Sequence, residues 1–118
     1  MNLTFTRQGP ICILRVEDSR IDASVAIAFK DRFRELVAGD TGDVILDLAK
    51  VDFLDSSGLG ALVAARKLLG AGRVLELAGL TPAVSKVMTL TRMTTVFPIH
   101  ADAAAAAAAR AGVSLTPK

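Results

Sequence analysis

"VILDLAKVDFLDSSGLGALVAARKLL", residues 44–69, holds the strongest structural signals in this chain. The run Asp43–Leu48 is apolar enough for a central strand that is covered on both faces. From about Ser57 to Leu69 the apolar residues have helical spacing, and Gly70 and Gly72 are typical of a helix end. We interpret the residues between them, "FLDSSGLG" at 53–60, as the end of a buried strand that turns through a polar corner into the helix.

The segments on either side continue the alternation of strand and helix. Leu3–Arg7 and Ile11–Val16, joined by the turn residues Gln8-Gly9-Pro10, predict an opening hairpin. Asp22 can cap a first helix that Gly39 ends. The later elements are expected to be a strand at Arg73–Leu77, a helix from Thr81-Pro82, a short edge strand at Thr95–Phe97 before Pro98, and a peripheral alanine-rich helix from Asp102 through Ala103–Ala109 to Gly112.

This order of elements, ββαβαβαβα, predicts an α/β fold. Right-handed crossovers between parallel neighbours give a single-layer, mixed, largely parallel β-sheet of about five strands with about four helices. A chain of 118 residues is long enough for one core, and we find no internal repeat or interdomain linker. We therefore expect a single domain over residues 1–118, with its core at about 3–110.

The composition excludes several functional classes. With 52% hydrophobic and 22% charged residues, the chain is typical of a globular protein. No apolar run approaches the roughly 18 residues of a membrane span, so direct membrane insertion is not expected. The N-terminal residues alternate in the manner of a strand and lack the regions of a secretory signal, which makes the cytoplasm the expected location.

Metal, cofactor and nucleic-acid sites are not expected either. One cysteine and one histidine cannot form a zinc site of several Cys or His ligands, and Cys12 lies in an apolar run that indicates a buried hydrophobe. The net charge of +2 comes from basic residues that are scattered among acidic ones, and the chain has no tryptophan or tyrosine for base stacking.

The polar corner itself admits a purely structural explanation. A strand that turns into a helix leaves backbone N–H groups free, and Asp55, Ser56 and Ser57 are all residue types that cap such donors. A serine nucleophile would need a neighbouring base, yet His100 is the only histidine and the motif is not Gly-x-Ser-x-Gly. A phosphate-binding loop would need a Gly-Lys-Ser/Thr sequence that is absent. Catalysis by this chain is therefore not predicted.

The helix after the corner has two different sides. Leu59, Leu62 and Leu69 point one way, and the small stripe of Ser57, Ala61, Ala64 and Leu68 points in a largely opposite direction. If the leucine side faces the core, the stripe faces outward and could dock a partner protein. The pattern alone does not separate this interpretation from one in which the domain's own elements cover the stripe.

Residues 44–69 resemble the signature of the STAS domain (sulfate transporter and anti-sigma-factor antagonist), in the stand-alone form of bacterial anti-sigma-factor antagonists. The resemblance extends through "SRIDASVAIAF" (19–29), "GLTPAVSKVMTLT" (79–91) and "VFPIHAD" (96–102). The segment "TRMTTVFPI" lacks a glycine that many relatives carry, and the alanine tail is atypical. These departures leave the serine corner intact and the identity of the partner open.

The resemblance implies a phosphorylation switch. The second serine of the motif, which an anti-sigma factor serine kinase phosphorylates with ATP, corresponds to Ser57. The unphosphorylated antagonist binds the anti-sigma factor, and a serine phosphatase of the metal-dependent type restores that state. Asp22 matches an acidic residue at the first helix start, although capping explains it equally well. The implied partner-binding residues are Asp22, Asp55, Ser56, Ser57, Gly58, Leu59, Ala61, Ala64 and Leu68.

A second function remains open within the same family. A STAS adaptor can sit as a cytoplasmic subunit on a membrane transport complex for lipids or anions, without a phosphate cycle. The retained motif serine favours the antagonist.

Overall fold

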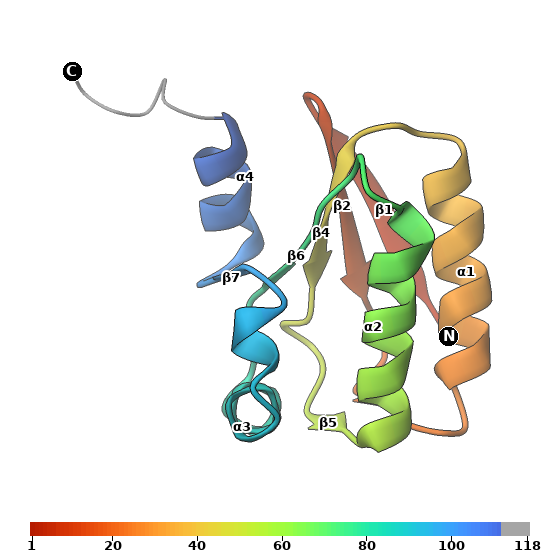
Figure 1. Ribbon diagram of the computed structural model, residues 1–118, viewed down its shortest axis with the longest axis vertical. Helices are drawn as coiled ribbons and strands as arrows, with labels where there is room; N and C mark the ends of the chain where they lie inside the picture. The colour runs from red at the N-terminus through yellow and green to blue at the C-terminus, as the bar shows by residue number, and fades with distance from the viewer. Residues whose placement is uncertain (112–118) are drawn as a thin grey trace.

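A five-stranded sheet with the order β1-β2-β4-β6-β7 organises the protein, whose computed structural model describes residues 1–111 (Figure 1). β1 is antiparallel to β2, and the other neighbouring strands are parallel. These five strands are β1 (Leu3–Gln8), β2 (Ile11–Val16), β4 (Asp43–Asp47), β6 (Leu75–Ala78) and β7 (Ile99–His100). A second, two-stranded sheet pairs β3 (Arg20–Ile21) in parallel with β5 (Phe53–Leu54).

Four α-helices connect and cover the strands. They are α1 (Ala26–Ala38), α2 (Ser56–Leu69), α3 (Pro82–Leu90) and α4 (Ala103–Ala111), with a short 3-10 helix, η1 (Met93–Thr95), after α3. The helices α1 and α2 run side by side over one face of the large sheet, and α4 lies on the other side (Figure 1). The predicted α/β class is therefore confirmed.

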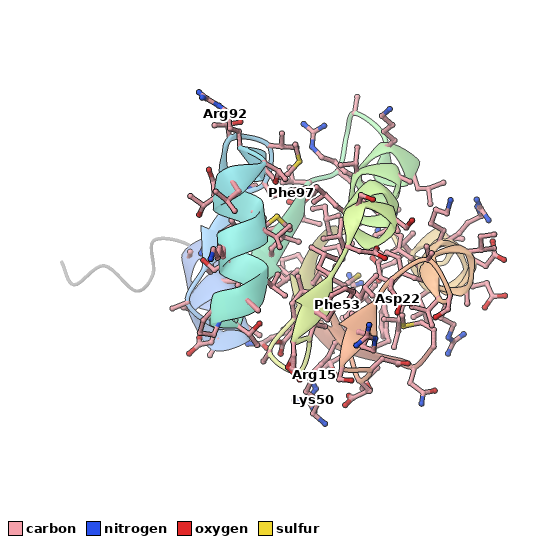
Figure 2. All side chains as sticks on the ribbon, turned by 90° about the horizontal axis from the view of Figure 1, so that it is seen from below. Arg15, Asp22, Lys50, Phe53, Arg92 and Phe97 are labelled. Atoms are coloured by element: carbon pink, nitrogen blue, oxygen red, sulfur yellow. The ribbon has the colours of Figure 1, made fainter. Side chains whose placement is uncertain are left out.

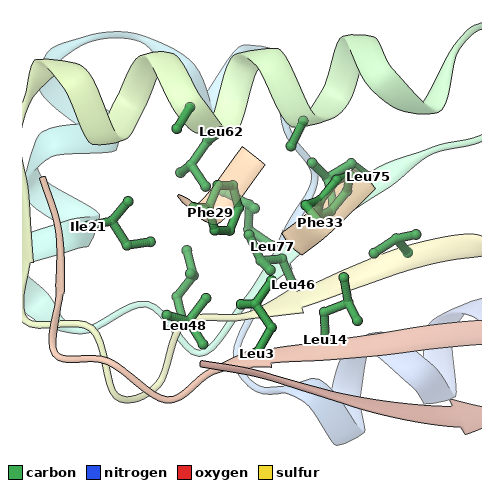
Figure 3. Packing of buried hydrophobic residues seen from close by; sticks show 14 of the residues in the cluster. Leu3, Leu14, Ile21, Phe29, Phe33, Leu46, Leu48, Leu62, Leu75 and Leu77 are labelled. Carbon is green, nitrogen blue, oxygen red and sulfur yellow. The ribbon is translucent and has the colours of Figure 1, made fainter. Parts of the chain in front are cut away.

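The main core lies between the sheet and the pair α1 and α2. Alternate residues of a strand point to opposite faces, so Val44 and Leu46 of β4 face these helices. There they share a cluster with Phe29 and Phe33 of α1 and Leu62 of α2, all fully buried (Figure 3). The apolar faces of α1 and α2 thus pack into the same core, which holds the two helices together.

The second face of the sheet has a smaller core. Ile45 of β4 joins Ile11, Ala78, Ala106 and Ala107 in a separate buried cluster. Because alanine side chains are short, α4 can lie close to the strands, consistent with the peripheral alanine helix predicted. Its expected terminator, Gly112, lies outside the described residues.

The first helix begins later than predicted. α1 starts at Ala26 with Val25 as the N-cap residue, so Asp22 does not cap it. Asp22 instead forms a turn, in which its carbonyl accepts from the Val25 N–H (3.1 Å) and its Oδ1 accepts from the Ser24 N–H (3.1 Å). Short polar side chains bond neighbouring backbone in this way, and capping and turn formation look alike in a sequence.

The predicted strand at Thr95–Phe97 is wrong. Arg92 has a left-handed backbone (φ 63°) that ends α3, and η1 follows at Met93–Thr95. Phe97 is 1% exposed and fills the core, which accounts for the apolar residues that suggested a strand. The edge strand is β7, just beyond Pro98, and the Pro98 carbonyl accepts from the Leu77 N–H at 2.9 Å. Its neighbour β6 begins at Leu75, two residues later than the predicted Arg73.

Candidate functional site

The serine corner has a short strand of its own. The central strand β4 ends at Asp47, and the chain turns before β5, which pairs with β3 and not with the large sheet. A strand does end at the corner, as expected, but it is the separate strand β5, and only its Leu54 is buried. The consequence for the site is that β3 and the turn containing Asp22 lie directly beside the start of α2.

Asp55 caps α2. Its Oδ1 accepts from the Gly58 N–H at 2.8 Å, and its carbonyl accepts from the Leu59 N–H at 2.9 Å. Ser56, which could also have been the cap, is the first helical residue and is exposed. Within residues 1–111 neither Ser56 nor Ser57 donates or accepts a side-chain hydrogen bond. Asp55 thus supplies the side-chain cap at the start of α2, and neither serine hydroxyl takes part in capping.

Close packing at Gly58 holds the start of α2 against β3 and β5. A Cβ atom at this position would lie 2.0 Å from the Ile21 carbonyl oxygen and 2.7 Å from Leu54 Cδ1. Only glycine allows the first turn of α2 to approach the backbone of β3 this closely. Gly58, which was predicted to contact a partner, is therefore buried.

Ser57, Gly60, Ala64 and Leu68 lie along one strip of the outer face of α2, and the helix also exposes Ser56, Arg66 and Lys67. Ser57 and Gly60 are exposed, Ala64 is half-buried, and Leu68 is 38% exposed. Ala61 was predicted to lie on this face, but it is 2% exposed and belongs to the core with Leu62 and Ala65. Leu59 is half-buried against the same core. The burial of Ala61 follows from the packing of α1 along α2, which helical spacing alone does not reveal.

Asp22 and Phe53 lie on neighbouring segments at the same end of the molecule (Figure 2). The Asp22 carboxylate accepts hydrogen bonds from Ser24 Oγ (2.6 Å) and Arg20 Nε (3.1 Å), and these two donors lower the pKa of Asp22. The Arg20 guanidinium lies 4.3 Å from the centre of the Phe53 ring, a cation–π arrangement. Asp22 therefore contributes a stable negative charge beside the corner.

Sequence reasoning missed the pair Arg20 and Phe53. Phe53 is 39% exposed although it sits in an apolar stretch, so its pattern suggested burial. No sequence signal could have found this exposure, because β5 has two residues and so shows no alternation.

Within residues 1–111, neither motif serine is hydrogen-bonded to a histidine. The single histidine, His100, lies in β7 with its Nε2 2.8 Å from Glu76 Oε1, and it has no contact with the corner. Among the residues that the structure describes, no three His, Cys, Asp or Glu side chains group as metal ligands, and no helix has the length and apolar character needed to cross a bilayer. The Ser57 hydroxyl is exposed at the start of α2 and is not hydrogen-bonded to a neighbouring base within residues 1–111.

Comparisons with known proteins agree with this geometry. The family model of the STAS domain matches residues 2–106. The fold is similar to an anti-sigma factor antagonist from Mycobacterium paratuberculosis, at 25% identity over 92% of each chain with a TM-score of 0.81. It is also similar to SpoIIAA in its unphosphorylated form, at 19% identity over 95% of this chain and 98% of that one, with a TM-score of 0.74.

The phosphorylated form of the Bacillus cell fate determinant SpoIIAA shares the fold as well, at 18% identity over 89% of this chain and 96% of that one, with a TM-score of 0.62. With a family match that covers most of its length and a fold that solved family members share, the chain belongs to the STAS domain family.

Proposed function

We propose that this protein is an anti-sigma-factor antagonist that binds an anti-sigma factor serine kinase and is released when Ser57 is phosphorylated. The observation that carries the proposal is the exposed, unengaged hydroxyl of Ser57 on the outer face of α2, beside a cap that Asp55 already supplies. The similarity to an anti-sigma factor antagonist, and to SpoIIAA in both phosphorylation states, supports it. The protein itself would work without catalysis, without a cofactor and without nucleic acid, in the cytoplasm.

The phosphate cycle involves two transfers. In the first, the Ser57 Oγ attacks the γ-phosphorus of ATP, the bond to the β-phosphate oxygen breaks, ADP leaves, and a base of the kinase takes the hydroxyl proton. In the second, a metal-dependent serine phosphatase directs water onto the phosphorus, which releases inorganic phosphate and restores the hydroxyl. All catalytic groups belong to the partners, and this chain supplies the acceptor.

The fold should tolerate the modification. Ser57 is the second residue of α2, and the N-terminal turn of a helix favours negative charge by about 0.3–1 kcal/mol. The carboxylates of Asp55 and Asp22 oppose a further negative charge nearby, so the net effect on the free energy of unfolding is expected to be small. The switch therefore requires no rearrangement of the domain.

A docked partner should not tolerate it. The outer face of α2 is small and apolar around Ser57, and Phe53 and Ile27 (69% exposed) add apolar surface at the same end of the molecule. A phosphoserine carries about −1.5 to −2 charges, and burying such a charge without a partner costs far more than an apolar contact returns. Phosphorylation would then release the partner by direct obstruction.

The predicted contact residues divide into two groups under this proposal. Ser56, Ser57, Ala64 and Leu68 offer exposed or half-exposed surface to the partner, and Asp22 adds a charge at its edge. Asp55, Gly58, Leu59 and Ala61 act indirectly, because they cap α2 or anchor it to the core.

The test starts from a pull-down from native lysate with the unphosphorylated protein as bait. The captured kinase is purified and incubated with ATP and the antagonist, and the phosphate is mapped by mass spectrometry. We expect one phosphate, on Ser57. Ser57→Ala should bind the kinase and accept no phosphate, while the matched control Ser56→Ala should be phosphorylated like the wild type. Labelling of Ser57→Ala at the wild-type level would exclude the site.

The same bait separates the antagonist from a transport adaptor. An adaptor would co-purify stably with a permease or its ATPase and show no phosphotransfer, and that pair of results would replace the proposal.

A further inference from the structure

A cavity of about 460 Å³ lies at the opposite end of α2 from Ser57. Its walls come from the last turn of α2, the connection into β6, and the link between η1 and β7. Arg66, Lys67 and Arg73 supply its charged groups, and Val74, Val96 and Pro98 supply apolar wall. Pockets of about 300–1,000 Å³ are the usual size for small-molecule ligands.

The charged groups of this cavity all have the same sign. Of its lining residues, none is acidic. Most of the chain's other arginines behave differently: Arg7, Arg15, Arg20, Arg32 and Arg34 each pair with a carboxylate. In the part of the chain that the structure describes, Arg66 and Lys67 form no ion pair. One carboxylate borders this wall, since Asp43 Oδ1 accepts from the Val74 N–H at 2.8 Å. The cavity therefore carries the positive charges of Arg66 and Lys67, which no ion pair within the described residues neutralises.

Arg73 adds a positive charge that the fold holds in place. Its Nε donates to the Gly42 carbonyl (2.7 Å) and its Nη1 to the Val37 carbonyl (3.0 Å), which fixes the guanidinium against the end of α1. Its Nη2 is buried and has no hydrogen-bond partner within residues 1–111. Because this nitrogen is shielded from solvent, Arg73 contributes a fixed positive charge to the cavity wall, and its buried Nη2 is not a donor open to a ligand.

Helix-end electrostatics explain only part of this arrangement. Basic residues in the last turn of a helix interact favourably with its dipole, and Arg66 and Lys67 lie in the last turn of α2. That role does not require Arg73, which lies outside the helix, and it does not require the apolar wall formed by Val96 and Pro98.

We propose that this cavity binds a small organic anion, with a phosphate or carboxylate group at Arg66 and Lys67, near the fixed charge of Arg73, and an apolar body against Val74, Val96 and Pro98. From Ser57 to Lys67 the helix rises about 15 Å, so the ligand would not touch the serine corner. The site is thus a second binding function, separate from the proposed switch, and its test needs no partner protein.

The test is a titration of the isotopically labelled protein followed by NMR, with phenyl phosphate, benzoate, inorganic phosphate and phenol as probes. Phenyl phosphate or benzoate should cause saturable shifts at the amides of Val74 and Val96, and whichever binds more tightly identifies the preferred acidic group. Inorganic phosphate should bind more weakly than phenyl phosphate, because it lacks the apolar body, and phenol should cause no saturable shift.

The variants test the charged groups. The double variant Arg66→Gln/Lys67→Gln should bind the better probe at least about tenfold more weakly, since charge-assisted hydrogen bonds are lost. Arg73 is left in place because it anchors α1. The matched control Lys30→Gln/Lys86→Gln removes the same net charge away from the cavity and should bind like the wild type. The absence of saturable shifts with both organic anions, or an equal loss in the control, would overturn the proposal.

Discussion

The two ends of α2 are built from different kinds of residue. The N-terminal end is capped by the Asp55 carboxylate and carries the positive end of the helix dipole. The buried Gly58 and two exposed serines lie in its first turn. At the C-terminal end, Arg66, Lys67 and Arg73 surround an open cavity. The first end is held by close backbone packing and can receive a negative charge, whereas the second offers positive charges that direct pairing leaves uncompensated. Under the two proposals, both ends of α2 would receive a negative charge, the N-terminal end through covalent modification of Ser57 and the C-terminal end through reversible binding of an anion.

The largest expected effect concerns the close packing at the N-terminal end. Gly58→Ala would place a Cβ 2.0 Å from the Ile21 carbonyl oxygen, so the backbone must move. We expect the free energy of unfolding to fall by about 3 kcal/mol, the upper part of the range for overpacked sites, measured by urea denaturation.

Gly60→Ala is the matched control, because a Cβ at this position meets no atom within 4 Å. It should raise the free energy of unfolding by up to about 1 kcal/mol through helix propensity. Equal destabilisation by the two alanines would show that the packing of Gly58 is not what holds the corner.

At the C-terminal end, stability depends on the hydrogen bonds that Arg73 donates. Arg73→Met removes the bonds to the Val37 and Gly42 carbonyls, and the unfolding free energy should drop by about 2 kcal/mol. The measurement is again urea denaturation, coupled to the phosphorylation assay. Since this end is far from Ser57, the folded variant should be phosphorylated at the wild-type rate. A loss of phosphorylation in folded protein would contradict the separation of the two ends.

The cap on α2 should have a smaller effect. Asp55→Ala leaves the Gly58 N–H without its acceptor and should lower the free energy of unfolding by about 1 kcal/mol. Asp55→Asn, which can still accept this hydrogen bond, should retain most of the stability in thermal melts. If alanine and asparagine behave alike, the side-chain cap is not stabilising.

Much of this architecture can be predicted from the sequence, for identifiable reasons. The apolar run of β4 and the helical spacing of α2 give the order and class of the fold, because periodicity reports which face of an element is buried. The pairing of β3 with β5 is not predictable in this way. Each has two residues, too few for a period, and α2 lies close to both of them at Gly58.

The candidate site could likewise be predicted only in part from the sequence. Ser57 could be selected from the motif, and its exposure agrees with that choice. Ala61 could not be placed correctly, because its burial depends on where α1 packs against α2 and not on its own helix. The cation–π pair of Arg20 and Phe53 and the basic cavity were also missed, since each joins side chains from segments that are distant in sequence.

The substitution that should change stability least, Ser57→Asp, should change binding to the proposed partner most. Ser57→Asp places one negative charge at the second residue of α2, and its unfolding free energy should stay within about 0.5 kcal/mol of the wild type. Urea denaturation checks this value, and a larger destabilisation would mean that the charge acts on the fold itself.

The most direct test of the switch is the dissociation constant for the captured anti-sigma kinase, measured by calorimetry with the protein stoichiometrically phosphorylated on Ser57 and with the unphosphorylated protein. We expect phosphorylation to weaken binding by at least about a hundredfold, which corresponds to roughly 2.7 kcal/mol. Equal dissociation constants for the two forms would contradict the account.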